Sequence, residues 1–323
     1  MADFVFATCL PGVEPAVKLD VARARPELRF AYSRPGLVTF KAARAVSPDD
    51  APGSVFAHVW GRSLGAARDP AAVAVQLAVL GATRVHVFAR EPEAAAGASV
   101  ALAPWQALGP GGPAELGELV ADVIVAPAPG EPAWLGVHRH DRARLPHAGG
   151  AIPVELPGDA PSRAYAKIEE AIAWAGLPVA PGHVALEIGA APGGAVLALA
   201  RRGLDVWGVD TGELAPHVLA LPNVHHLARK VSALRWEELP ARIDWLLVDV
   251  NLAPQVAIHE VGRLMPRLIK TLRGAVFTLK LNDWTFVSEL PALAERLARL
   301  GLPDVRMRHL PSNRREICAV ALR

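Results

Sequence analysis

The sequence predicts a Rossmann-like α/β fold for residues 151–323, preceded by two small α+β modules. Short apolar runs alternate with helical stretches in the second half of the chain, as is typical of a mostly parallel, doubly wound sheet. A glycine-rich turn follows the first of these runs, and charged residues interrupt two later ones. In such sheets ligands bind beyond the carboxyl ends of the strands. We therefore expect a ligand site at that edge.

The length and composition restrict the class of protein. A chain of 323 residues suits two or three domains. Its hydrophobic fraction is 52%, but every long apolar window contains a charge, a glycine or a proline, so no membrane span is predicted. The first ten residues lack the basic region of a secretory signal. We expect a cytoplasmic protein without a membrane partner, either a monomer or a weak oligomer.

The first half of the chain is predicted to form the two small modules. Residues 1–53 contain a strand, a helix and a hairpin around the turn SRPG. The composition of residues 47–53, SPDDAPG, indicates a joint. Residues 54–150 carry further strands in RVHVFAR and in ADVIVAPAPGEPAWLGVHR. Between residues 90 and 116 the sequence is rich in Pro, Ala and Gly, which suggests a loose connection.

The elements of the α/β domain follow one another at short intervals. A helix is predicted over residues 162–176, directly before the first strand. The predicted strands are residues 183–189, 205–210, 223–228, 243–250, 274–281 and 316–322.

The turn after the first strand, GAAPGG, has the glycine spacing G-x-x-x-G-G. It lacks the Gly-Lys-Ser/Thr ending of an ATP-binding P-loop, and it departs from the dinucleotide pattern G-x-G-x-x-G. S-adenosylmethionine has an adenosine but no pyrophosphate, so its site needs a close backbone and a carboxylate for the ribose more than an anion cradle. Asp210, at the end of the second strand, is placed for that contact. The alternative is that Asp210 only caps the strand end.

Two charged residues lie in runs that should be sheet core. Asp249 ends the run WLLVDV, and Lys280 lies inside AVFTLKL. Charges are seldom buried unless they are paired. Both would converge at the ligand edge of the sheet, either as part of a site or as a structural salt bridge. Lys167 on the predicted helix and Glu316 at the start of the last strand would, taken singly, be ordinary exposed charges.

The order Lys167, Asp249, Lys280, Glu316, together with the motifs DAPSRAYAKIEEA, LEIGAAPGG, LLVDV, FTLKL and RREICAVALR, resembles the FtsJ-type RNA 2'-O-ribose methyltransferases. The resemblance implies that residues 151–323 form a class I methyltransferase domain whose catalytic tetrad is these four residues, with Lys280 as the base. It implies S-adenosylmethionine as the cofactor, held by Gly189, Ala190, Pro192, Gly193, Gly194, Asp210 and Asp249.

The same resemblance implies a ferredoxin-like domain in residues 1–53, a THUMP-like RNA-binding domain in residues 54–150, and 23S ribosomal RNA as the substrate. Two positions depart from the family. Ala195 stands where tryptophan is usual, and the segment around Lys230 lacks the usual adenine-recognising acid. These departures leave open a non-catalytic RNA-binding protein. Another RNA, such as transfer RNA, also stays open, and a nicotinamide-dependent oxidoreductase is disfavoured by the glycine spacing.

Three basic clusters are candidates for phosphate contacts, and each could equally be a solvated face. They are residues 138–144, 200–203 and 306–315. Trp134 could stack on a base or pack in the core. No group of histidines has the spacing of a metal site, so we expect no metal. Cys9 and Cys318 match no redox or metal spacing and are expected to be buried free thiols.

Overall fold

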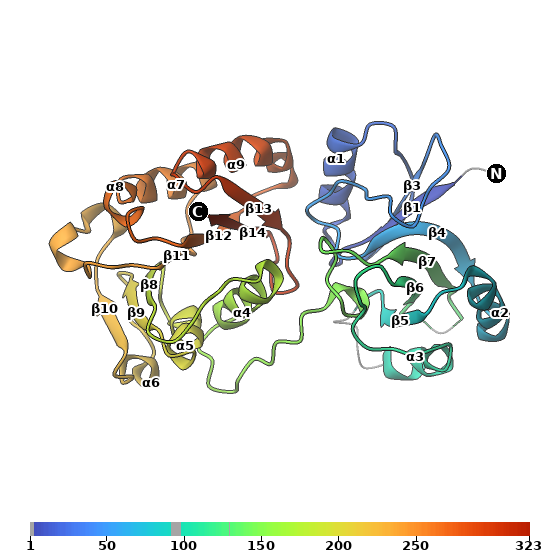
Figure 1. Ribbon diagram of the computed structural model, residues 1–323, viewed down its shortest axis with the longest axis horizontal. Coiled ribbons are helices and arrows are strands. Elements are labelled where there is room, and N and C mark those ends of the chain that lie inside the picture. Colours follow the sequence, from blue (N-terminus) through green and yellow to red (C-terminus); the bar gives the residue numbers. More distant parts are fainter. Residues whose placement is uncertain (1–2, 92–97, 129) are drawn as a thin grey trace. The chain divides into compact units, whose positions relative to one another are not determined.

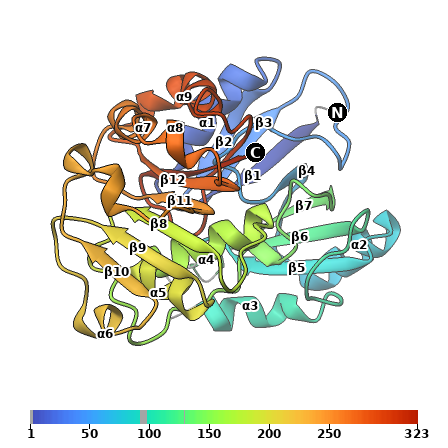
Figure 2. The same ribbon diagram turned by 60° about the vertical axis from the view of Figure 1, so that its left-hand side comes forward.

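The structure is a computed structural model that describes residues 3–91, 98–128 and 130–323. The chain divides into two compact units, Met1–Ile152 and Pro153–Arg323. Each unit is built on one seven-stranded sheet (Figures 1 and 2). In the part of the chain that is described, no helix is long and apolar enough to cross a membrane.

The first unit has one sheet with the strand order β2-β3-β1-β4-β7-β6-β5. Its strands are β1 (Phe4–Thr8), β2 (Arg29–Arg34), β3 (Leu37–Lys41), β4 (Trp60–Ala67), β5 (Arg84–Ala89), β6 (Leu119–Val125) and β7 (Ala133–Arg139). Its helical elements are α1 (Glu14–Ala24), α2 (Pro70–Leu80), α3 (Ala98–Gln106) and the short η2 (Ala148–Gly150). The predicted loose connection thus contains a helix, α3, and its residues 92–97 lie outside the described residues.

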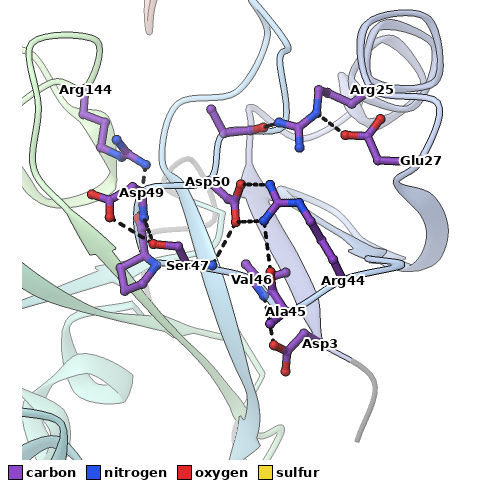
Figure 3. A network of polar contacts seen from close by, with 12 residues as sticks. Asp3, Arg25, Glu27, Arg44, Ala45, Val46, Ser47, Asp49, Asp50 and Arg144 are labelled. Atoms are coloured by element: carbon purple, nitrogen blue, oxygen red, sulfur yellow. Dashed lines mark hydrogen bonds and ion pairs between the residues drawn. The ribbon is translucent and has the colours of Figure 1, made fainter.

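The sheet of the first unit continues across the predicted joint at residues 47–53. β1 pairs with β3 on one side and with β4 on the other, so residues 1–53 and 54–150 share one sheet. Polar contacts also fix the segment, as Figure 3 shows. Arg44 pairs with Asp50 at 2.5 Å, and the Val46 amide donates to Asp3 at 2.9 Å. The joint therefore does not separate two compact units, because its sequence is folded into a hydrogen-bonded turn.

The second unit has the strand order β10-β9-β8-β11-β12-β14-β13. Its strands are β8 (Val184–Ile188), β9 (Asp205–Val209), β10 (Val224–Leu227), β11 (Trp245–Val248), β12 (Gly274–Lys280), β13 (Asp304–Arg308) and β14 (Glu316–Leu322). The strands β8 to β12 run parallel to one another, and β14 runs antiparallel to its neighbours β12 and β13. The predicted doubly wound, mostly parallel sheet is confirmed, and β13 is a strand that the prediction missed.

Helices cover both faces of this sheet, α4 and α5 on one side and α7, α8 and α9 on the other (Figure 1). Their bounds are α4 (Ala164–Ala175), α5 (Gly194–Arg201), α6 (Pro216–Leu219), α7 (Pro254–Gly262), α8 (Met265–Leu268) and α9 (Leu290–Ala298), with short 3-10 turns η3 (Val231–Ala233), η4 (Trp236–Glu238) and η5 (Trp284–Glu289). The strand order reverses between β8 and β11, so this pair lies at the switch point where α/β sheets bind ligands.

Candidate active site

Sheet pairing brings three of the four predicted catalytic residues to one edge. Asp249 directly follows β11, and its amide donates to the carbonyl of Ile188 on β8 at 3.0 Å. Lys280 ends β12 and is paired across the sheet with Glu316, the first residue of β14. Because β14 is antiparallel, its amino end lies beside the carboxyl ends of β11 and β12. The topology therefore places these side chains together.

Lys167 is supplied by α4, the helix predicted before the first strand. Its ammonium nitrogen lies 3.1 Å from Oδ2 of Asp249 and 2.6 Å from Oε2 of Glu316. The ammonium nitrogen of Lys280 lies 2.8 Å from Oδ1 of Asp249 and 2.6 Å from Oε1 of Glu316. The four groups form a closed ring in which lysines and carboxylates alternate. Their side chains are only 13 to 21% exposed.

In the ring, each lysine lies between two carboxylates and each carboxylate between two lysines. This arrangement shifts the pKa values of Lys280 and Glu316. Burial disfavours the charged form of Lys280, but the Asp249 and Glu316 carboxylates outweigh it and raise the lysine pKa above its usual value. Burial also opposes ionisation of Glu316, but hydrogen bonds from Lys167 and Lys280 lower that pKa below its usual value. Lys280 is therefore an ammonium in the resting ring, and it must lose a proton before it can act as a base.

The glycine turn after β8 passes close to the ring. Gly189 has a φ of 90°, and a Cβ there would lie 2.2 Å from the carbonyl oxygen of Asp249. Gly193 has a φ of 106°, and a Cβ on Gly194 would lie 2.3 Å from Oγ of Ser162. Ala190 and Pro192 lie in the same turn. Side chains at these glycines would strain the backbone or clash with neighbouring segments.

Asp210 follows β9 and is bonded to this turn. Its Oδ2 accepts from the Ala191 amide at 3.0 Å, and its Oδ1 accepts from the Gly212 amide at 2.9 Å. It is thus a cap, as the alternative interpretation held. Each carboxylate oxygen has a second lone pair, so the cap does not prevent a ligand contact.

A cleft of about 580 Å³ opens beside these residues, a volume within the usual range for small-molecule sites. It is lined by segments that follow β8, β9, β10 and β11 and by α7. Among its polar lining residues are Asp210, Lys230, Asp249, Asn251 and Glu260. Asp249 belongs to both the cleft wall and the ring. The cleft and the ring are therefore parts of one site.

Sequence reasoning missed Glu187, which lies inside β8. It is fully buried, and its Oε2 has no hydrogen-bond partner among the described residues. It borders a small space of about 20 Å³, enough for one water molecule, together with Lys167, Ala195 and Asp249. Burial, reinforced by the charges of Asp249 and Asp210, raises its pKa well above the usual value. A carboxylate in the apolar run VALEI could have been found by the rule that identified Lys280.

Glu260 and Glu170 were also missed. Glu260 on α7 brings a carboxylate to the cleft wall, although the segment around Lys230 has none. Glu170 on α4 is buried and accepts two hydrogen bonds from Ser312. Both lie on helices, where a single glutamate is ordinarily an exposed charge, so neither stood out in the sequence, although Glu170 lies within the motif DAPSRAYAKIEEA.

Ion pairs within the chain engage charges in the first two predicted basic clusters. In the first, His138 is buried against Asp122 at 2.6 Å and Arg144 is buried against Asp141. In the second, Arg201 pairs with Asp159 and Arg202 with Glu169. His138 and Arg144 are buried and cannot reach a phosphate, whereas phosphate contacts by Arg201 and Arg202, which are 41% and 39% exposed, stay a prediction.

In the third cluster Arg308 is buried, while Arg314 and Arg315 are exposed directly before Glu316. This pair of arginines is the part of the three clusters best placed for a substrate phosphate. Cys9 and Cys318 are buried free thiols, as predicted. Within the described ranges no group of His, Cys, Asp and Glu that could hold a metal was found.

Together, the switch-point cleft, the glycine turn and the charged ring define a Rossmann-like α/β domain with a small-molecule-sized cleft beside a cluster of ionisable groups. The chain is 36% identical over 217 residues to the ribosomal RNA large subunit methyltransferase M of Alkalilimnicola ehrlichii, covering 61% of this chain and 58% of that protein. It is 33% identical over 186 residues to the protein of the same name from Chromohalobacter salexigens, covering 54% and 50%. The resemblance inferred from the motifs is confirmed by these relatives.

The match spans between half and three fifths of the length of these two relatives. A comparison with models of known protein families gave no match. Among solved structures, a Burkholderia thailandensis methyltransferase with bound S-adenosylhomocysteine has a TM-score of 0.37 and 20% identity, covering 51% of this chain and 78% of that one. A structural similarity this low does not indicate a function.

Proposed function

We propose that this protein is an S-adenosylmethionine-dependent methyltransferase that methylates the 2'-hydroxyl of a ribose in large-subunit ribosomal RNA. The observation that carries the proposal is the closed ring of Lys167, Asp249, Lys280 and Glu316 at the end of a nucleoside-sized cleft. The names of the curated relatives support an RNA substrate from the large ribosomal subunit. The ring supports a reaction in which a hydroxyl loses its proton.

The residues of the cleft fit the cofactor. The turn at Gly189, Gly193 and Gly194 keeps backbone where side chains would fill the space. Asp210 retains lone pairs for ribose hydroxyls, and Glu260 and Asn251 offer polar groups on the cleft wall. S-adenosylmethionine supplies an electrophilic methyl group when bound.

The ring then has two tasks, to position the ribose and to accept its proton. A protonated hydroxyl is a poor nucleophile, so a base must remove the proton as the new bond forms. Lys280 is assigned this role, although Asp249 and Glu316 hold it as an ammonium in the resting ring. Asp249 also lines the cleft, so a positively charged cofactor bound there would share this carboxylate with Lys167 and Lys280, and the hold of Asp249 on the Lys280 proton would weaken. Lys167 keeps Glu316 and Asp249 in place while Lys280 is neutral.

The experiment that tests the proposal is transfer of labelled methyl from S-adenosylmethionine to ribosomal RNA from a strain lacking this protein. Wild-type protein is expected to label the RNA. Lys280→Ala is expected to reduce transfer at least a hundredfold while cofactor binding, measured by calorimetry, is retained. Equal transfer by Lys280→Ala would remove Lys280 from the base role. Absence of both transfer and cofactor binding in the wild type would overturn the proposed function.

A further inference from the structure

Strand β2 (Arg29–Arg34) has an unusual surface for an edge strand. It lies at one end of the first unit's sheet, and its sequence RFAYSR contains two aromatic residues, two arginines and no acid. Five of its six residues are exposed. Phe30 is 54% and Tyr32 is 36% exposed, and they are the two aromatic residues among the exposed large hydrophobic residues of the described chain.

Tyr32 belongs to a stack of three flat groups. Its ring lies 5.3 Å from the Trp134 ring at an angle of 11°, and the Arg34 guanidinium lies 5.2 Å from its centroid. The Trp134 indole donates to Oγ of Ser63 at 2.9 Å, which fixes its orientation. Trp134 is therefore neither fully in the core nor free. It supports an exposed tyrosine and, through the tyrosine, the Arg34 guanidinium.

Phe30 carries a second cation on the other side of the strand. The Lys18 ammonium lies 4.4 Å from its ring centroid and donates to Oγ of Ser33 at 2.8 Å. A register shift pairs Phe30 with Phe40 and Tyr32 with Thr39. Phe40 and Thr39 are consecutive on β3, so their side chains point to opposite faces of the sheet. The edge thus presents one aromatic–cation pair on each face.

The charges of this edge are not neutralised. Elsewhere in the unit, arginines such as Arg44, Arg84 and Arg90 pair with carboxylates. No ion pair with a carboxylate was found in the described residues for the cations at the edge, which are Lys18, Arg29, Arg34 and Lys41. This charge favours an anionic partner. It disfavours pairing with the same strand of a second copy, because like charges would meet.

We propose that the β2 edge binds unpaired nucleotides of the RNA substrate, an inference that rests on the proposed function for the identity of the RNA. Aromatic side chains beside arginines and lysines are the usual means of binding single-stranded RNA, because every base has a face that stacks and every nucleotide has a phosphate. Bases stack on Phe30 and on the Arg34 guanidinium that lies over Tyr32, and Arg29 contacts phosphates. A duplex hides its base faces and binds this edge more weakly.

The test is binding of the full chain to a fluorescein-labelled single-stranded 12-nucleotide RNA, measured by anisotropy at several salt concentrations. Tyr32→Ala and Phe30→Ala are each expected to weaken binding about tenfold, and Tyr32→Phe by less than about twofold because the ring is kept. Arg34→Ala is expected to lower the slope of log K against log salt by about one. The matched controls are Val79→Ala on α2 and Arg296→Ala on α9, both exposed, and they should bind as the wild type does.

The inference would be overturned if Phe30→Ala and Arg34→Ala both bound the single-stranded RNA with the same affinity as the wild type. These two side chains are exposed, so the variants should fold even if Tyr32→Ala, which uncovers Trp134, does not. Binding to the duplex as tight as to the single strand would also contradict it. A wild-type dimer that the β2 variants disrupt, with RNA binding unchanged, would assign the edge to a second copy instead. This assay measures RNA binding and not methyl transfer. A failure of the inference about the β2 edge can therefore be distinguished from a failure of the proposed function.

Discussion

At the scale of single residues, the protonation of Lys280 decides how the rate depends on pH. Its pKa is raised by Asp249 and Glu316, so the neutral form that the base role requires is scarce at neutral pH and increases as pH rises. We expect log kcat/KM to rise by about one per pH unit between pH 6 and 9, since this parameter follows the free enzyme. A plateau reached below pH 8 in a pH profile would show that Lys280 is not the base.

Asp210 is the residue whose replacement should affect the cofactor and leave the ring intact. Asp210→Ala removes two hydrogen bonds that hold the Ala191 and Gly212 amides, so the turn loses its fixed position and the ribose loses an acceptor. We expect cofactor affinity to fall about 10- to 100-fold, as for loss of one or two hydrogen bonds to a charged group. Calorimetry measures this. An unchanged dissociation constant would mean that Asp210 is a cap and nothing more.

The four residues of the ring were predictable to different degrees. Lys280 and Asp249 were visible because a charge in an apolar strand must have a partner. Lys167 and Glu316 looked ordinary by composition, and only their order with the other two singled them out. The raised pKa of Lys280 could not be predicted, because it depends on distances of 2.6 to 2.8 Å that only the folded chain defines.

At the scale of elements, α4 holds two parts of the site. It supplies Lys167 to the ring, and one turn later Glu170 accepts from the amide and Oγ of Ser312 at 2.8 and 2.7 Å. Ser312 lies in the loop that leads into Glu316. One helix therefore positions a lysine and a carboxylate that must meet at 2.6 Å.

Glu170 contacts Ser312 and acts on the ring only through it. Replacing Glu170 should therefore lower the rate of methyl transfer. Glu170→Ala is expected to lower kcat at least tenfold, with a smaller change in the KM for S-adenosylmethionine, because a small misplacement of reacting groups is costly. Ser312→Ala, which loses one of the two bonds, should have a smaller effect. Steady-state kinetics and melting curves check this. A lower melting temperature with an unchanged kcat would make Glu170 purely structural.

The elements that the sequence predicted well are those with unbroken apolar runs. All six predicted strands of the second unit are present, with their ends within two residues of the predicted ones. β13, whose sequence DVRMR alternates charged and apolar residues at the sheet edge, was missed because one side of it is exposed. β4, WGRSLGAA, was missed for a related reason, since small residues give it little apolar pattern.

At the scale of the whole molecule, the chain divides into Met1–Ile152 and Pro153–Arg323, and the first unit contains both of the segments that the sequence suggested as modules. Composition at residues 47–53 suggested a joint, whereas Arg44, Asp50 and Asp3 bind that segment within one unit (Figure 3). Long-range strand pairing such as that of β1 with β4 leaves no mark in composition. The ferredoxin-like and THUMP-like descriptions of the two segments stay predictions.

The two units carry separable tasks in the function proposed here. The ring and the cleft lie wholly within the second unit, whereas the β2 edge lies in the first. Substitutions at β2 should therefore change the apparent affinity for RNA and leave cofactor affinity as it is. Substitution of Asp210 should weaken cofactor affinity and leave the affinity for RNA as it is.

The central claim is that the methyl group goes to a ribose 2'-oxygen. The most direct test is alkaline hydrolysis of the labelled RNA product, because a phosphodiester next to a 2'-O-methyl group cannot be cleaved by alkali. Label transferred by the wild type is expected in alkali-resistant dinucleotides, and it should be absent when Lys280→Ala is used. Label recovered in mononucleotides, on a base, would contradict the claim.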